Sequence, residues 1–149
     1  MQLDYFKGAE TTIASLPELK RSIPLLEKRL ARLTEAGMPR EPSGVDFSKS
    51  YVDSHHVNDT LSELLAVAET QREINATRSE ITEIEKALSE IPEEQRRVVT
   101  LFYIDKLSAT EIAERIFVES EKTVYKIRNK GVANFAVLYY GALAKGSGR

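Results

Sequence analysis

The residues best suited to specific chemistry lie between Ser120 and Lys130, near the C-terminal end of the chain. Lysine, arginine and asparagine side chains are gathered there along one side of a predicted helix. Lysine or arginine can donate hydrogen bonds to guanine O6 and N7, and asparagine can pair with adenine N6 and N7. Hydroxyl side chains and the first N–H groups of a helix suit phosphate oxygens. The segment therefore predicts contacts with duplex nucleic acid.

The candidate DNA-binding residues are one residue at the start of the preceding helix and the polar residues of this segment. Among them, Tyr125 can stack on a sugar or touch a thymine methyl, or it can cover the edge of the core. The whole face can also be an ordinary solvated surface, since surface helices have a polar side. The candidates are Thr110, Ser120, Glu121, Lys122, Thr123, Tyr125, Lys126, Arg128, Asn129 and Lys130.

The charge of the 149-residue chain is unevenly distributed, although its net charge is only −2. Residues 1–91 contain 11 Lys and Arg against 16 Asp and Glu, a net charge of −5. Residues 92–149 contain 10 against 7, a net charge of +3, and from Ser120 onward the count is 6 against 1. This asymmetry favours an anion-binding element near the C-terminus.

Three short helices are expected to position the basic segment. The first begins at Pro92, whose missing N–H costs nothing in a first turn, and ends near Asp105. The second begins with a capping box, in which Ser108 caps the helix and Glu111 reaches back. Ser120 caps the third, and this arrangement is typical of a helix-turn-helix. The apolar residues expected to face inward are Val98, Leu101, Phe102, Ile112, Ala113, Ile116, Val124 and Ile127.

This segment resembles region 4 of bacterial sigma factors, a module that binds a promoter element. The resemblance implies a helix-turn-helix whose helix 120–140 enters the major groove. The sequence departs from the family pattern in the turn between the second and third helices. This turn is one residue longer than the usual form of the family and has Phe117 where glycine is expected. The matching residues are Ile91, Pro92, Glu93, Glu94, Arg97, Val98, Val99, Leu101, Tyr103, Leu107, Ser108, Glu111, Ile112, Ala113, Glu114, Ile116, Ser120, Thr123, Val124 and Ile127.

The N-terminal part of the chain predicts two long helices joined by a linker. We expect the first over residues 11–36, with a kink or restart at Pro24, and the second over residues 57–90. The linker 37–54 is rich in Gly, Pro and Ser and is expected to be flexible. Each helix has an apolar seam, which can pack within one chain or against a second copy. The seams are Leu16, Leu19, Ile23, Leu26, Leu30 and Leu33 in the first helix, and Val67, Ile74, Ile81 and Leu88 in the second.

These elements predict an all-α fold. It consists of a coiled-coil-like helical arm over residues 1–91, a helix-turn-helix domain over 92–141 and a disordered tail over 142–149. Gly141 is expected to end the last helix. The whole architecture resembles the ArpU/RinA-like late-gene transcription regulators of Gram-positive phages and prophages. That resemblance implies DNA binding and control of phage late or packaging genes.

The expected partners are double-stranded DNA, RNA polymerase and a second copy bound through the helical arm. A single copy has few cations for phosphate, so either a second copy or polymerase must strengthen its binding. Two other classes of protein also agree with the sequence. One is a phage terminase small subunit, which would recognise packaging-site DNA as a ring, and the other is a structural protein that uses its helices only for protein contacts.

The sequence indicates binding and no catalysis. The chain has no cysteine, which excludes disulfides and thiolate metal sites and suits the cytoplasm of a bacterial host cell. The adjacent His55 and His56 do not converge on one ion without a special turn, so no metal is expected. No phosphate loop or nucleophile–base spacing indicates an enzyme or a cofactor. No signal peptide and no membrane span are expected.

Overall fold

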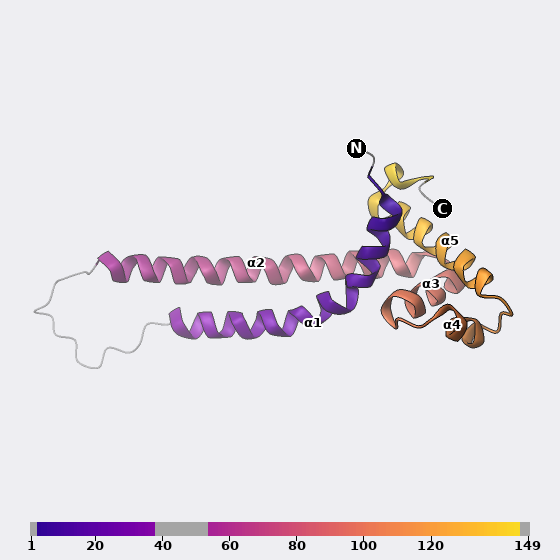
Figure 1. Ribbon diagram of the computed structural model, residues 1–149. Coiled ribbons are helices and arrows are strands. Elements are labelled where there is room, and N and C mark those ends of the chain that lie inside the picture. The colour runs from indigo at the N-terminus through magenta and orange to yellow at the C-terminus, as the bar shows by residue number, and fades with distance from the viewer. Residues whose placement is uncertain (1–2, 38–53, 147–149) are drawn as a thin grey trace, which may run out of the picture. The chain divides into compact units, whose positions relative to one another are not determined.

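The computed structural model describes residues 3–37 and 54–146 (Figure 1). In these residues the chain is helical and has no strand, so the predicted all-α fold is confirmed. Two long helices precede a C-terminal group of shorter ones. The elements are α1 (Tyr5–Gly37), α2 (Ser54–Glu90), α3 (Glu93–Val99), the π-helical segment η1 (Thr100–Ile104), α4 (Ala109–Ile116), α5 (Glu121–Tyr140) and the 3₁₀ turn η2 (Ala142–Ala144).

The contacts divide the chain into two compact units, and both long helices contribute to each. One unit comprises Met1–Lys20 and Ser79–Arg149, and the other comprises Arg21–Arg78. The division expected at residue 91 does not coincide with these units. The reason is that apolar residues from the first turns of α1 and the last turns of α2 are buried together with the C-terminal helices.

The larger core of the first unit is made by α1, α2, α3, η1, α5 and η2. Each fully buried aliphatic or aromatic side chain contributes about 1.5–3 kcal/mol relative to exposure. Residues 6–16 therefore help to stabilise the C-terminal helices. The core residues are Phe6, Ala9, Ile13, Leu16, Ile84, Ala87, Leu88, Ile91, Val99, Tyr103, Val132, Phe135, Ala136 and Ala144.

Helix α1 begins earlier than the sequence predicts, at Tyr5 and not near residue 11. The side chain of Asp4 accepts a hydrogen bond from the N–H of Lys7 at 3.0 Å, which is the contact of an N-cap. The sequence did not predict this start because Gly8 lies in the first turns, and glycine is a poor helix former. Its place in the helix has a packing reason, because a Cβ on Gly8 would lie 3.0 Å from the hydroxyl of Tyr140.

Helix α1 runs without interruption through Pro24, so it does not restart there, which was one of the two expected alternatives. Proline removes one hydrogen bond from the helix, but Pro24 is exposed, so the freed carbonyl can be hydrated. Helix α2 begins at Ser54, three residues before the expected start, and the expected linker residues 38–53 lie outside the described residues.

In the second unit, the later part of α1 packs beside the earlier part of α2. Ile74 and Thr70 of α2 are buried, and Arg78 forms an ion pair with Glu27. The seam residues of α1 from Ile23 to Leu33 are half-buried. The seams therefore meet within one chain, which was one of the two expected arrangements.

Residues 142–146 are more ordered than expected. Gly141 has a φ of 86° and ends α5, as the sequence predicts. However, the tail predicted from residue 142 begins with the turn η2, and Ala144 is 1% exposed. Its small side chain fits into the larger core, a contact that composition alone does not reveal. The residues 147–149 lie outside the described part.

Helices α3 and α5 approach most closely at Gly131. A Cβ at this position would lie 2.7 Å from Cγ2 of Val99 and 3.3 Å from the carbonyl oxygen of Gln95. Beside this contact, Asn134 of α5 donates a hydrogen bond to the side-chain oxygen of Gln95 at 2.6 Å. The absence of a side chain at Gly131 therefore sets the distance between the two helices.

Replacing Gly131 with alanine should destabilise the protein by about 1–3 kcal/mol through overpacking. The better helix propensity of alanine offsets at most about 1 kcal/mol of this destabilisation. Urea denaturation of G131A, V99A and the double variant tests the cause. Removing the Val99 methyl groups should make G131A markedly less costly, whereas strictly additive losses would contradict a clash at this point.

A second contact ties α1 to the C-terminal helices through a buried phenol. The hydroxyl of Tyr103 donates a hydrogen bond to Glu10 at 2.9 Å. Burial, together with this hydrogen bond, raises the pKa of Tyr103 above its ordinary value. The phenol is thus held in its protonated form.

Because of this shift, the Tyr103 contribution should be lost at alkaline pH. Above about pH 10 the unfolded chain releases the phenolic proton while the folded chain retains it, so the free energy of unfolding falls as pH rises. At neutral pH the free energy of unfolding of the wild type should exceed that of Y103F by roughly 1 kcal/mol. Denaturation curves taken up to about pH 11.5 should show this difference shrinking, and a constant difference would refute the assignment.

Candidate nucleic-acid interface

A second, smaller core joins α3, η1, α4 and α5. Its buried residues include Val98, Ile112 and Val124, which are each 0% exposed. Ile116 and Ile127, which were also expected to face inward, are partly buried against it. This core holds α4 and α5 as the two helices of a helix-turn-helix (Figure 1).

The predicted helix starts of α4 and α5 are both present. The Ser108 hydroxyl accepts the N–H of Glu111 at 3.2 Å, and the Glu111 carboxylate accepts the N–H of Ser108 at 3.4 Å. The Ser120 hydroxyl accepts the N–H of Lys122 at 3.1 Å. These contacts satisfy N–H groups that have no partner within their helices, so they fix where each helix begins.

The turn between α4 and α5 has a left-handed residue that is not glycine. Phe117 has a φ of 59° and a ψ of 43°, and the N–H of Val118 donates to the carbonyl of Ala113 at 3.0 Å. The helix therefore ends in the usual left-handed cap, although phenylalanine is less suited to it than glycine. The Phe117 side chain is 92% exposed, so no packing within the described residues compensates for this strain.

The first helix of the group was expected to continue regularly to Asp105, but it does not. From Thr100 to Ile104 it widens into a π-helix, and the N–H of Asp105 donates to the carbonyl of Thr100 at 3.0 Å. A π-turn inserts one extra residue and so rotates the side chains that follow it. Within this segment Tyr103 faces α1, and the neighbouring Phe102 faces α5.

The three lysines of α5 share one exposed face. Lys122, Lys126 and Lys130 recur every four residues and are all exposed. Ser120 at the start of α5 is exposed as well, and Thr123 is half-buried. Thr110 of α4 donates a hydrogen bond to the carboxylate of Glu121, so these two predicted residues lie together beside the first turn of α5.

Arg128 does not lie with the lysines. Its guanidinium carbon is 4.7 Å from the centre of the Phe102 ring and 4.9 Å from that of Tyr125. Arg128 follows the buried Val124 by four positions, which places both on the inner side of α5. The prediction that Arg128 is on the outer face is therefore wrong. Tyr125 is 41% exposed, so it both covers the core edge and borders solvent.

Asn129 is held by Arg128. The side-chain oxygen of Asn129 accepts hydrogen bonds from Nε of Arg128 at 3.0 Å and from a terminal guanidinium nitrogen at 2.7 Å. Asn129 is half-buried and lies at the border of the lysine face. The pairing of an asparagine with adenine requires this same oxygen, so that expectation does not fit the arrangement.

Arg97 was not among the candidates, yet it links two helices of the group. Its guanidinium donates a hydrogen bond to the carbonyl of Arg115 at 3.2 Å, at the end of α4. Cations stabilise this end of a helix because its last carbonyls lack partners. No spacing in the sequence connects α3 with the end of α4, so this contact could be found only in the structure.

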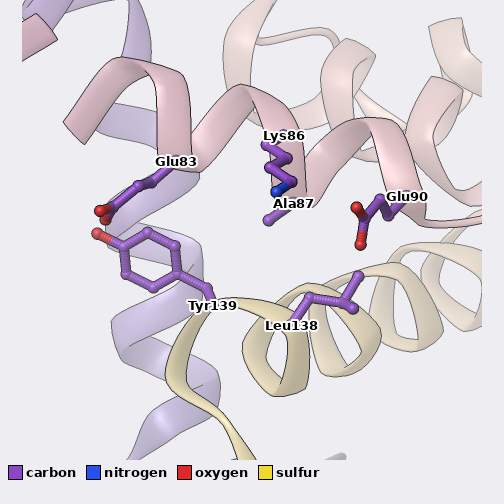
Figure 2. A pocket seen from close by; sticks show the side chains of 6 residues that line it. All are labelled: Glu83, Lys86, Ala87, Glu90, Leu138 and Tyr139. Carbon is purple, nitrogen blue, oxygen red and sulfur yellow. The ribbon is translucent and has the colours of Figure 1, made fainter. Parts of the chain in front are cut away.

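A shallow hollow of about 420 Å³ lies between α2 and α5 in the first unit (Figure 2). Leu138 and Tyr139 of α5 face a row of side chains from α2 across it. The hydroxyl of Tyr139 donates a hydrogen bond to Glu80 of α2. The hollow carries more carboxylates than ammonium groups, so it does not suit phosphate. The α2 residues that line it are Glu83, Lys86, Ala87 and Glu90.

Among residues 3–37 and 54–146, no helix is long and apolar enough to cross a membrane. No group of three or more His, Cys, Asp or Glu side chains in the same ranges is placed to hold a metal ion.

Comparison with known proteins supports the helix-turn-helix. Residues 81–126 match the family model described as Sigma-70, region 4. The match begins in the last turns of α2, includes α3, η1 and α4, and ends in the second turn of α5. No curated protein and no solved structure matches the chain. The match bears out the resemblance to sigma-factor region 4 and supports DNA binding by this domain.

Proposed function

We propose that this protein is a transcriptional regulator that binds double-stranded DNA by placing α5 in the major groove. The observation that carries the proposal is the exposed face of Lys122, Lys126 and Lys130. This face lies on the second helix of a helix-turn-helix, and the sigma-factor region 4 match includes its first two lysines. An α-helix fits the major groove, and lysine can donate to phosphate or to guanine there.

The contacts at the start of α5 support the same docking. The hydroxyl groups of Ser120 and Thr110 lie beside the first turn of α5, next to the first lysine, and hydroxyl groups are suited to phosphate oxygens. Hydrogen bonds to phosphate would set the position of the helix along the duplex, and side chains further along α5 would contact base edges. In this proposal Glu121 accepts a hydrogen bond from a cytosine amino group.

The resemblance of the whole architecture to ArpU/RinA-like regulators suggests where such a protein acts. We propose that it controls late genes of a phage or prophage in a bacterial cytoplasm, and that RNA polymerase is a second partner. The small number of free cations agrees with a regulator that does not act alone on DNA. Arg128 is engaged with two aromatic rings, so the described part of α5 offers three cations to phosphate.

Removing two of the lysines should weaken DNA binding and its salt dependence together. For K126A/K130A, the slope of log affinity against log salt concentration should fall by about 2 per copy, because each lost phosphate contact reduces it by about 1. Filter retention or anisotropy with duplex DNA at several salt concentrations measures this slope.

The matched control is K7A/K28A, which removes the same charge from exposed positions on α1. Its slope should remain that of the wild type. If both double variants bind DNA alike, the lysine face of α5 is not the DNA-binding surface.

A second copy is proposed to bind through α2. Leu61, Leu64 and Leu65 recur at helical spacing near its N-terminal end and are 55%, 57% and 56% exposed. Exposed leucines gathered on one face are typical of an interaction surface. Two copies would double the phosphate contacts and would bind half-sites about one helical turn, or a multiple of it, apart.

Native mass measurement should therefore find a dimer that L61E/L65E converts to a monomer with unchanged helix content. A wild-type monomer would contradict the α2 surface. A ring of about eight or more copies would contradict the regulator and favour a terminase small subunit, since such subunits assemble into rings.

A further inference from the structure

The side-chain amide of Asn129 on α5 is held by two hydrogen bonds. Its oxygen accepts two hydrogen bonds from Arg128, at 3.0 Å and 2.7 Å. A guanidinium has five N–H donors and no acceptor, so the amide must present its oxygen, and not its nitrogen, to Arg128. The orientation of the amide thus follows from chemistry alone.

Arg128 is itself held in place. Its guanidinium lies over the rings of Phe102 and Tyr125, whose centres are 6.3 Å apart. Cations over aromatic rings are stabilised by the negative charge of the ring faces, and more strongly when water is excluded. Phe102 comes from η1 and Tyr125 from α5, so the guanidinium is fixed by contacts from two elements before any ligand arrives.

The nitrogen of the Asn129 amide remains available. Within the described part of the chain Nδ2 has no hydrogen-bond partner, and no buried side-chain nitrogen or oxygen there lacks one. Nδ2 is therefore accessible to solvent. Asn129 follows Lys126 by three residues and Tyr125 by four, so its amide borders the face proposed to contact DNA.

We infer that Asn129 selects a base as a hydrogen-bond donor only, and that Arg128 is the residue that positions it. This inference rests on the proposed DNA binding. Both lone-pair directions of the amide oxygen are used by Arg128, so Asn129 cannot accept from an exocyclic amino group. Its two N–H bonds match the acceptors O6 and N7 of guanine, or O4 of thymine.

The orientation of the Asn129 amide disfavours cytosine and adenine, each for its own reason. Cytosine presents an amino donor in the major groove, which would meet a second donor. Adenine presents N7 beside its amino group, and that amino group would lose water without gaining an acceptor. An asparagine that is free to turn would prefer adenine, so the contact with Arg128 reverses the usual preference.

The test is selection of bound duplexes from random DNA by the full chain and by two variants. The wild type should enrich guanine or thymine at the position that depends on Asn129. In N129D the carboxylate keeps the contact with Arg128 but has no donor, so the preference at that position should change to cytosine by about tenfold or more. R128K makes fewer hydrogen bonds to the amide and should admit adenine there.

N75D is the matched control, because it makes the same change of charge on an exposed residue of α2 that also accepts a hydrogen bond. It should leave the selected sequence unchanged. Equal thermal stability of N129D and N75D would show that the effect is not one of folding.

Three results would overturn the inference. The first is selection of adenine by the wild type at the position that depends on Asn129. The second is N129D binding the wild-type sequence with a uniform loss of affinity, in which case DNA binding stands and only the role of Asn129 fails. The third is the absence of DNA retention by every form of the chain, in which case the proposed function fails with it.

Discussion

The close contact between α3 and α5 at Gly131 determines how α5 is rotated about its own axis. With no side chain at Gly131, α5 can lie against Val99 and the backbone of Gln95. Val124 then falls in the smaller core, and Val132 and Phe135 fall in the larger one. Because a helix is rigid, burying these residues leaves the lysines at 122, 126 and 130 on the opposite side. The exposed basic face is thus a consequence of packing on the inner face.

The same helix explains why the N-terminus belongs to the C-terminal unit. A helix-turn-helix needs only the first half of α5, and the second half carries Val132, Phe135, Ala136 and Tyr140. Those residues would be exposed without a cover. The first turns of α1 supply it through Phe6, Ile13 and the hydrogen bond between Thr12 and Tyr140. The N-terminal residues are therefore part of the structure that holds α5 in place.

Local features were predictable and non-local ones were not. The caps at Ser108 and Ser120 and the helix end at Gly141 depend on a few neighbouring residues, and each was found in the expected place. The start of α1 was missed because Gly8 is explained only by Tyr140, far along the chain. Arg128 was misplaced because its partner Phe102 lies on another helical segment, and residue spacing within α5 does not reveal that contact.

The position of Arg128 also reduces the number of C-terminal cations that are available to phosphate. Six cations follow Ser120 in the sequence, but a guanidinium stacked on two rings and bonded to Asn129 is not free to pair with phosphate. Non-specific affinity for DNA comes from phosphate contacts, so a domain with few of them binds random sequences weakly. Its discrimination between sites then depends more on fixed hydrogen bonds to base edges, each of which distinguishes bases by about 1–3 kcal/mol. In the proposed complex with DNA, using one cation to orient an amide would therefore lower general attraction to DNA and raise the share of binding energy that depends on sequence.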